Sequence, residues 1–159
     1  MKHRVINIEW EGPFNVPYAK DTWDYEKISL PNQKEEKTGF YCIYGRHPVY
    51  GRDVLLYIGE TKPNELNSRS FSVRFKEHFN GRFWQHINLS VHVGTTQAKL
   101  DASEFTLVES ILIAAHMPAL NRQYIDGSSS NSKKFVIRNY GFLGSLIPEC
   151  SGEYWAKDT

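Results

Sequence analysis

Two short apolar runs form the clearest hydrophobic pattern in the chain. The first reads GFYCIYG at residues 39–45, and the second reads VLLYIGE at residues 54–60. Both are rich in aromatic and branched side chains and are bounded by glycine, which is typical of β-strands. The connection between them contains Pro48 and Gly51. We therefore predict an antiparallel hairpin with a long loop.

Side chains alternate between the two faces of a strand, so the pattern also predicts which residues share a face. Tyr41 falls with Ile43 on one face of the first strand, and Tyr57 falls with Leu55, opposite Leu56, in the second. The hairpin can therefore hold the hydroxyls of Tyr41 and Tyr57 on the same side of one sheet. A tyrosine in a strand is also often a packing residue with a solvated tip, and alternation alone leaves both interpretations open.

Further regular elements are expected on both sides of the hairpin. Alternating apolar residues predict strands at 4–10, 86–93 and 133–140. Apolar residues one turn apart predict helices at 72–79 and 102–116.

Both predicted helices carry start and stop signals. Ser72 is a candidate N-cap of the first helix, and Gly81 is placed to end it. The second helix opens on the capping-box pattern Asp101-Ala-Ser-Glu104 and ends before Pro118. Residues 32–37 and 61–72 are polar and predict exposed connections.

Length and composition limit the class of protein. The 159 residues are enough for one domain with a core and few for two, and 40% apolar with 23% charged residues is ordinary for a globular chain. No apolar run approaches the ~20 residues of a membrane span, and the N-terminus lacks a signal-peptide pattern. Cys42 and Cys150 form neither a disulfide framework nor a metal-ligand spacing. We expect an intracellular, cytoplasmic protein.

Charge is unevenly distributed although the net charge is only +1. Residues 38–82 hold seven Lys or Arg against four Asp or Glu, and residues 120–138 hold four against one. A local positive surface suited to a polyanion is therefore possible on a nearly neutral chain. These charge clusters are explained equally well as ordinary charged faces exposed to solvent, with no polyanion bound.

Three polar side chains stand out in the predicted helices. Arg74 and His78 are four residues apart and so share one helix face. Glu109 lies in the middle of a nearly apolar helix, where burying a lone carboxylate is costly unless a cation or hydrogen-bond donors meet it. Taken singly, each residue is explained equally well by a place on the surface.

Gly39-Phe40-Tyr41 and Tyr57-Ile58-Gly59 together resemble the paired signature of the GIY-YIG nuclease superfamily, with phenylalanine in place of the usual isoleucine. Tyr41, Tyr57, Arg74, His78, Glu109 and Asn121 follow in the order of that family's site residues. The resemblance covers roughly residues 38–122. The six residues as a set are far more specific to the family than any one of them.

The resemblance implies an α+β fold with a small three-stranded antiparallel sheet flanked by helices. It implies a nuclease core at residues 38–124, with a C-terminal extension at 125–159. Residues 1–37 would form an N-terminal extension that packs on this core, since they contain too many aromatics for a disordered tail.

The resemblance also implies roles for the six residues in hydrolysing a phosphodiester. Glu109 would hold Mg²⁺, for which Mn²⁺ can substitute, and Arg74 would neutralise phosphate charge. Tyr41 would be the general base or a relay that passes the proton to His78. Tyr57 would hydrogen-bond the phosphate or a water, and Asn121 would orient the site or hold the end of the Glu109 helix.

The expected partner is double-stranded DNA. The residues expected to bind it are basic ones near the motifs, namely Lys62, Arg69, Lys76, Arg122, Lys133 and Lys134. Within the family the pattern resembles the restriction endonuclease branch, with a homodimer favoured for a double-strand cut and not needed by a nickase. A repair or mobile-element nuclease, an RNA nuclease, and a binding or interaction module without catalysis stay open.

Overall fold

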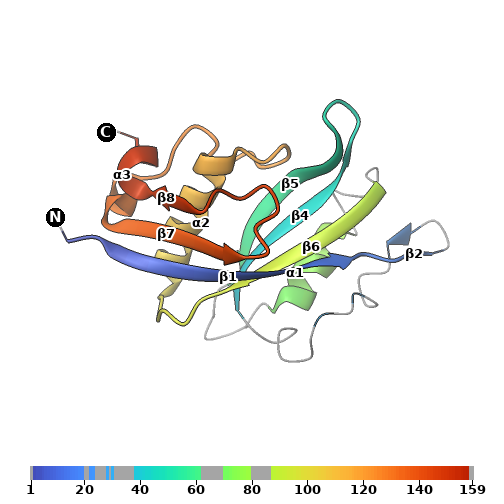
Figure 1. The fold of residues 1–159 in the computed structure, drawn as a ribbon, viewed down its shortest axis with the longest axis horizontal. Helices are drawn as coiled ribbons and strands as arrows, with labels where there is room; N and C mark the ends of the chain where they lie inside the picture. The colour runs from blue at the N-terminus through green and yellow to red at the C-terminus, as the bar shows by residue number, and fades with distance from the viewer. Residues whose placement is uncertain are drawn as a thin grey trace.

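A computed structural model describes residues 2–19, 22–23, 28, 30, 38–61, 70–79 and 87–157. The strands are β1 (Arg4–Asn15), β2 (Tyr18–Ala19), β3 (Thr22–Trp23), β4 (Gly39–His47), β5 (Gly51–Thr61), β6 (Ile87–Thr95), β7 (Phe135–Gly141) and β8 (Glu149–Ser151). The helices are α1 (Phe71–Phe79), α2 (Ala102–His116), the 3₁₀-helix η2 (Ser130–Lys134) and α3 (Gly152–Trp155). Figure 1 shows their arrangement.

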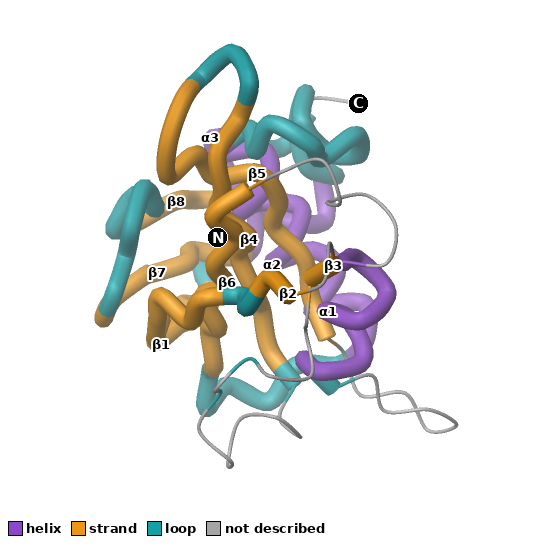
Figure 2. Tube along the Cα trace, turned by 90° about the vertical axis from the view of Figure 1, so that its right-hand side faces the viewer, coloured by secondary structure: helices purple, strands orange, loops and turns teal. Residues whose placement is uncertain are grey.

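One six-stranded mixed sheet dominates the molecule, in the order β5-β4-β6-β1-β7-β8. The β1–β7 pair is parallel and the other pairs are antiparallel. The strands curve into a half-barrel (Figure 2). The expectation of a small three-stranded antiparallel sheet flanked by helices is therefore wrong. Its three strands exist as β5-β4-β6, but they are half of a larger sheet that both ends of the chain complete.

β1 lies inside this sheet, between β6 and β7. Its alternating residues Ile6, Ile8 and Trp10 are buried, whereas Val5 is exposed, as the period-2 pattern predicts. The segment expected as an N-terminal extension thus shares a sheet with the expected core, and so does the C-terminal segment through β7 and β8.

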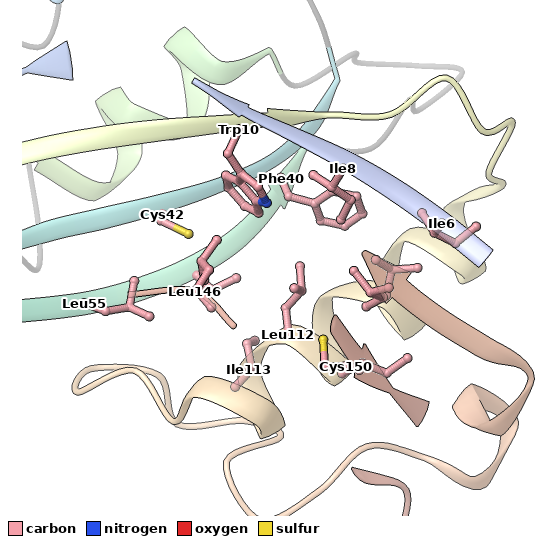
Figure 3. Packing of buried hydrophobic residues seen from close by; sticks show 14 of the residues in the cluster. Ile6, Ile8, Trp10, Phe40, Cys42, Leu55, Leu112, Ile113, Leu146 and Cys150 are labelled. Carbon is pink, nitrogen blue, oxygen red and sulfur yellow. The ribbon is translucent and has the colours of Figure 1, made fainter. Parts of the chain in front are cut away.

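The core on one face of the sheet lies against α2. Ile8 and Trp10 from β1, and Phe40 from β4, pack in one cluster with Leu112 and Ile113 of this helix (Figure 3). Burying such large apolar side chains contributes roughly 1.5–3 kcal/mol each before conformational entropy is counted. The helix itself confirms the predicted span and capping box, because Asp101 accepts a hydrogen bond from the Glu104 backbone and Glu104 accepts one in return from the Asp101 backbone.

A second cluster covers the opposite face, under α1. It contains Tyr41 and Ile43 of β4 with Phe71 and Phe75 of α1. The helix begins at Phe71, one residue before the predicted N-cap Ser72. Ser70 stands in the capping place instead, and its carbonyl accepts a hydrogen bond from the Arg74 backbone at 3.2 Å.

Several sequence predictions lie outside the described residues. They include the connection at 32–37, most of the loop at 61–72, the helix end at Gly81, and residue His86 at the start of a predicted strand. Among the helices that are described, none has the length and apolar character needed to cross a membrane.

His92 is a buried histidine that makes stability depend on pH. It packs against Tyr44 and Phe142, with ring centroids 4.6 and 5.1 Å away, and burial lowers its pKa to about 4. Unfolding restores a pKa near ~6.5, so the unfolded chain binds more protons between these values. We expect the free energy of unfolding to fall by up to roughly 3 kcal/mol as pH drops from 7 to 4.5. Urea titrations should show a shallower fall for His92→Gln, and equal slopes would contradict this assignment.

Candidate active site

The hairpin of β4 and β5 brings the two signature tyrosines together on the α1 face. Their rings stack with centroids 6.2 Å apart and an interplanar angle of 25°. A β-bulge lies at Leu56, because Ile43 pairs with Tyr57 whereas Tyr44 pairs with Leu55. Leu56 and Tyr57 consequently lie on one face, and Leu55 packs in the cluster on the other. The prediction that the two tyrosines lie on the same side of the sheet is thus confirmed, but the alternation predicted within β5 is wrong at the bulge.

The last glycine of the YIG triplet makes room for the first tyrosine. A Cβ on Gly59 would lie only 2.3 Å from the hydroxyl oxygen and 2.4 Å from Cζ of Tyr41. Gly39, the first residue of the other triplet, is equally confined, since a Cβ there would lie 2.2 Å from the carbonyl oxygen of Gly94. Both glycines are explained by close packing of β4 against its neighbours.

Gly59→Ala should therefore displace the Tyr41 ring. We expect a loss of about 2 kcal/mol in the free energy of unfolding, typical of an overpacked core, measured by urea denaturation. The double variant Tyr41→Ala/Gly59→Ala removes the clash and should show a smaller cost than the sum of the single changes. A Gly59→Ala protein as stable as the wild type would contradict this packing.

Helix α1 sets Arg74 and His78 beside the tyrosines. The Tyr41 hydroxyl and Nε2 of His78 are 2.7 Å apart and hydrogen-bonded, and the His78 and Tyr57 ring centroids are 4.6 Å apart. Nη1 of Arg74 donates to Glu77 at 2.6 Å. Nε of Arg74 is buried and finds no hydrogen-bond acceptor among the described residues. A buried guanidinium N–H of this kind is suited to an anionic oxygen supplied by a ligand.

Burial raises the pKa of the Tyr41 phenol well above its usual value. The charge of Arg74 and its hydrogen bond to Tyr41 oppose this effect, whereas the charges of Tyr57 and Glu109 add to it. Tyr41 is therefore a neutral phenol near neutral pH. It can pass a proton onward, but a free phenolate at this position is strongly disfavoured.

Glu109 lies near Tyr57 and belongs to α2, the helix that packs on the other face of the sheet. It is half-buried on α2 and lines a cavity of about 260 Å³ together with Tyr57, Asn121 and Arg122. The charge of Glu109 also raises the pKa of Tyr41. The carboxylate thus lies in a polar cavity beside Tyr57, and not in a dry core, but Tyr41, Arg74 and His78 line no part of that cavity.

The residues present fit a weakly held Mg²⁺. No three His, Cys, Asp or Glu side chains gather as a metal cluster in the part of the chain that is described. Mg²⁺, however, keeps most of its waters and is commonly bound by one or two carboxylates plus substrate phosphate. Glu109 can supply that single carboxylate, with substrate oxygens completing the shell.

Asn121 has a structural task at this site. Its Oδ1 accepts from the Ile58 backbone N–H at 2.9 Å, and its Nδ2 donates to the Ile58 carbonyl at 3.0 Å. The preceding residues Ala119 and Leu120 donate to Leu55 and Leu56 of β5 at 3.1 and 2.8 Å. The segment after α2 is thereby fastened along the free side of β5, which supports the expected role of holding the end of the Glu109 helix.

The residues expected to bind DNA are only partly near this cavity. Arg122 lines it, and Lys76 is exposed on α1, the helix of Arg74. Lys133 and Lys134 belong to η2 and line no part of it, and Lys134 lies over Phe135 and 3.9 Å from Glu104. Lys62 and Arg69 fall outside the described residues.

Tyr124 is a lining residue that sequence reasoning missed. It has a left-handed backbone (φ 62°) and lies in the cavity wall with Gln123. Its only sequence signal is its position shortly after Asn121. A larger groove, of about 980 Å³, lies among Tyr44, His92 and Phe142, and none of the six signature residues lines it.

Comparisons with family models, with curated proteins and with solved structures found no match to this chain.

Proposed function

We propose that the protein is a divalent-metal-dependent endonuclease that hydrolyses DNA phosphodiester bonds, related to the GIY-YIG nucleases and of the restriction type. One observation supports this proposal above the others. Four chemically complementary side chains of β4, β5 and α1 lie together, namely Tyr41, Tyr57, Arg74 and His78. Glu109 of α2 shares a cavity wall with Tyr57, and its charge raises the pKa of Tyr41. Packing alone does not require a phenol, an imidazole and a guanidinium at one place, with a carboxylate close by.

In this proposal Arg74 binds the phosphate and Glu109 binds the metal ion. Arg74 binds a non-bridging oxygen of the scissile phosphate through its buried Nε–H and so neutralises charge that builds up as the bond breaks. Glu109, in the wall of the cavity that Tyr57 also lines, would hold the metal ion. When bound, Mg²⁺ supplies Lewis-acid stabilisation of the phosphoryl oxygens and the departing 3′ oxygen.

Tyr41 and His78 form the route for the proton. The attacking water gives a proton to the Tyr41 oxygen while the phenol gives its own proton to Nε2 of His78, and the water oxygen bonds to phosphorus as the bond to the 3′ oxygen breaks. The two transfers must be concerted, because burial disfavours a free phenolate. Tyr57, half-buried in the cavity wall, is placed to hydrogen-bond the phosphate or the water.

Tyr41→Phe should preserve the packed ring and break this route. We expect single-turnover cleavage to slow by about 10²–10⁴-fold with DNA affinity largely kept. Tyr44→Phe is the matched control, because Tyr44 is on the same strand but faces the other cluster, where its hydroxyl accepts from Ser145. Full activity in Tyr41→Phe would remove Tyr41 from the proton route.

The proposal is tested by incubating the protein with plasmid DNA, mixed genomic DNA and RNA, with Mg²⁺ and with chelator. We expect cleavage of DNA with Mg²⁺ and none with chelator. Sequencing the ends of the genomic fragments then gives the recognition site. If the folded protein binds DNA but leaves it intact with every metal ion tested, a binding module is favoured instead. Cleavage confined to RNA would change the substrate class.

A further inference from the structure

The tip of the β4–β5 hairpin is an exposed apolar feature that the proposed chemistry does not use. Val49 and Tyr50 at this tip are 77% and 70% exposed. The hairpin projects from the rest of the molecule (Figure 1). Large apolar side chains held out in water at the end of a projecting element indicate a contact surface.

His47 holds this tip in one conformation. Its Nδ1 accepts hydrogen bonds from the backbone N–H groups of Val49 and Tyr50 at 3.1 and 3.2 Å. Its ring also stacks on Tyr50, with centroids 4.6 Å apart and an angle of 22°. A tip that is already ordered loses less conformational entropy on binding, so it is suited to insertion into a partner.

The groove beside the tip and the Glu109 cavity share one lining residue, Asn121. Tyr50 lines a groove of about 510 Å³ that follows β5 and the segment after α2 as far as Asn121. Asn121 also lines the Glu109 cavity. No acidic residue lines this groove. Exposed Arg46 and Arg52 flank the tip, and exposed Asp53 follows Arg52. The partner that best suits an aromatic tip between two arginines is a nucleic acid.

We propose that the β4–β5 tip is a wedge that places Val49 and Tyr50 against the bases of double-stranded DNA, away from the scissile phosphate. This inference rests on the proposed nuclease function for its choice of partner. Tyr50 precedes Tyr57 by seven positions, which corresponds to roughly 20 Å along a strand. For a duplex that lies along β5, ~3.4 Å per base pair puts the contacted step about six base pairs from the cut.

The test measures DNA binding in chelator, so that it does not depend on cleavage. Fluorescence anisotropy with a pool of mixed-sequence duplexes should show Kd raised about tenfold or more by Tyr50→Ala, because a stacked base is lost. Tyr50→Phe should bind as the wild type does, since the ring is kept. Tyr154→Ala is the matched control, because Tyr154 is 78% exposed on α3. Arg46→Gln and Arg52→Gln should each lower the slope of log Kd against log salt by about one.

Three outcomes would overturn the wedge. In the first, Tyr50→Ala binds DNA as tightly as the wild type. In the second, the wild type binds no duplex DNA. In the third, Tyr50→Ala changes the sedimentation of the protein from dimer to monomer and leaves DNA affinity intact, so the tip joins two copies of the chain. Failure of the nuclease proposal looks different, because DNA binding would persist with its dependence on Tyr50 while no phosphodiester is cut.

Once a cut site is mapped, the position of the unstacked bases can be measured as well. Thymines about six base pairs from the cut should become reactive to permanganate with the wild type, as bases unstacked by a wedge do. They should lose that reactivity with Tyr50→Ala. Reactive thymines only at the cut itself would contradict the proposed geometry.

Discussion

Arg74→Lys should cleave DNA at least ~10³-fold more slowly than the wild type. Lysine keeps the positive charge but replaces a planar fork by a point charge, so it cannot donate to Glu77 and to a phosphate in the same arrangement. The buried Nε–H that we assign to the phosphate is lost as well. Single-turnover plasmid nicking at saturating protein is the measurement, because it separates the chemical step from binding.

The matched control for this change is Arg138→Lys. Arg138 also pairs with a glutamate, Glu149, at 2.8 Å, but it is exposed on β7 and lines no part of the cavity. We expect its cleavage rate to equal that of the wild type. An Arg74→Lys rate within tenfold of the wild type, in a protein that unfolds at the same urea concentration, would remove Arg74 from contact with the phosphate.

Glu109→Gln should lose metal-dependent cleavage by a similar factor, ~10³-fold or more. The amide has the same shape and keeps one carbonyl oxygen, but it has no charge to attract a hard divalent cation. Because a single carboxylate holds the ion, raising Mg²⁺ or substituting Mn²⁺ should recover only part of the rate. The measurement is the cleavage rate as a function of metal concentration.

The control for this variant is Glu149→Gln, which removes a carboxylate from an exposed pair on β8. It should keep the metal dependence of the wild type. Unchanged cleavage at low Mg²⁺ in Glu109→Gln would mean that another group holds the metal.

Local patterns predicted the elements well, for physical reasons that can be named. Helix α2 has the expected span because its capping box and left-handed Met117 before Pro118 are encoded within a few residues. The hairpin followed from turn residues and alternation. The bulge in β5 was not predicted, because an extra residue in a strand depends on tertiary packing: Leu56 and Tyr57 belong to the cluster under α1, whereas Leu55 belongs to the cluster on the other face.

The architecture could not be obtained from such patterns. β1 pairs with β6 and in parallel with β7, and these partners lie roughly eighty and more than a hundred residues away. A strand with apolar residues at every second position indicates one buried face, but not which neighbours it takes. The three-stranded expectation came from the family resemblance, and it counted the terminal strands as extensions.

The candidate site was predicted as a set of residues, and the structure brings most of the set together. The helical spacing of Arg74 and His78 places both near Tyr41, as expected for neighbours one turn apart. The amide of Asn121, however, is engaged with the Ile58 backbone, a contact that no local pattern encodes. The assignment to the GIY-YIG nucleases and the roles of these residues stay predictions.

The most direct test of the proposed site is the position of the metal. Once the genomic digest gives a cleavage sequence, the Tyr41→Phe protein can be crystallised with that DNA and Mn²⁺, and anomalous scattering locates the ion. We predict one manganese about 2.1 Å from a carboxylate oxygen of Glu109, with the scissile phosphate between it and the Arg74 guanidinium. A manganese bound elsewhere, or a phosphate that does not contact Arg74, would contradict the proposed site.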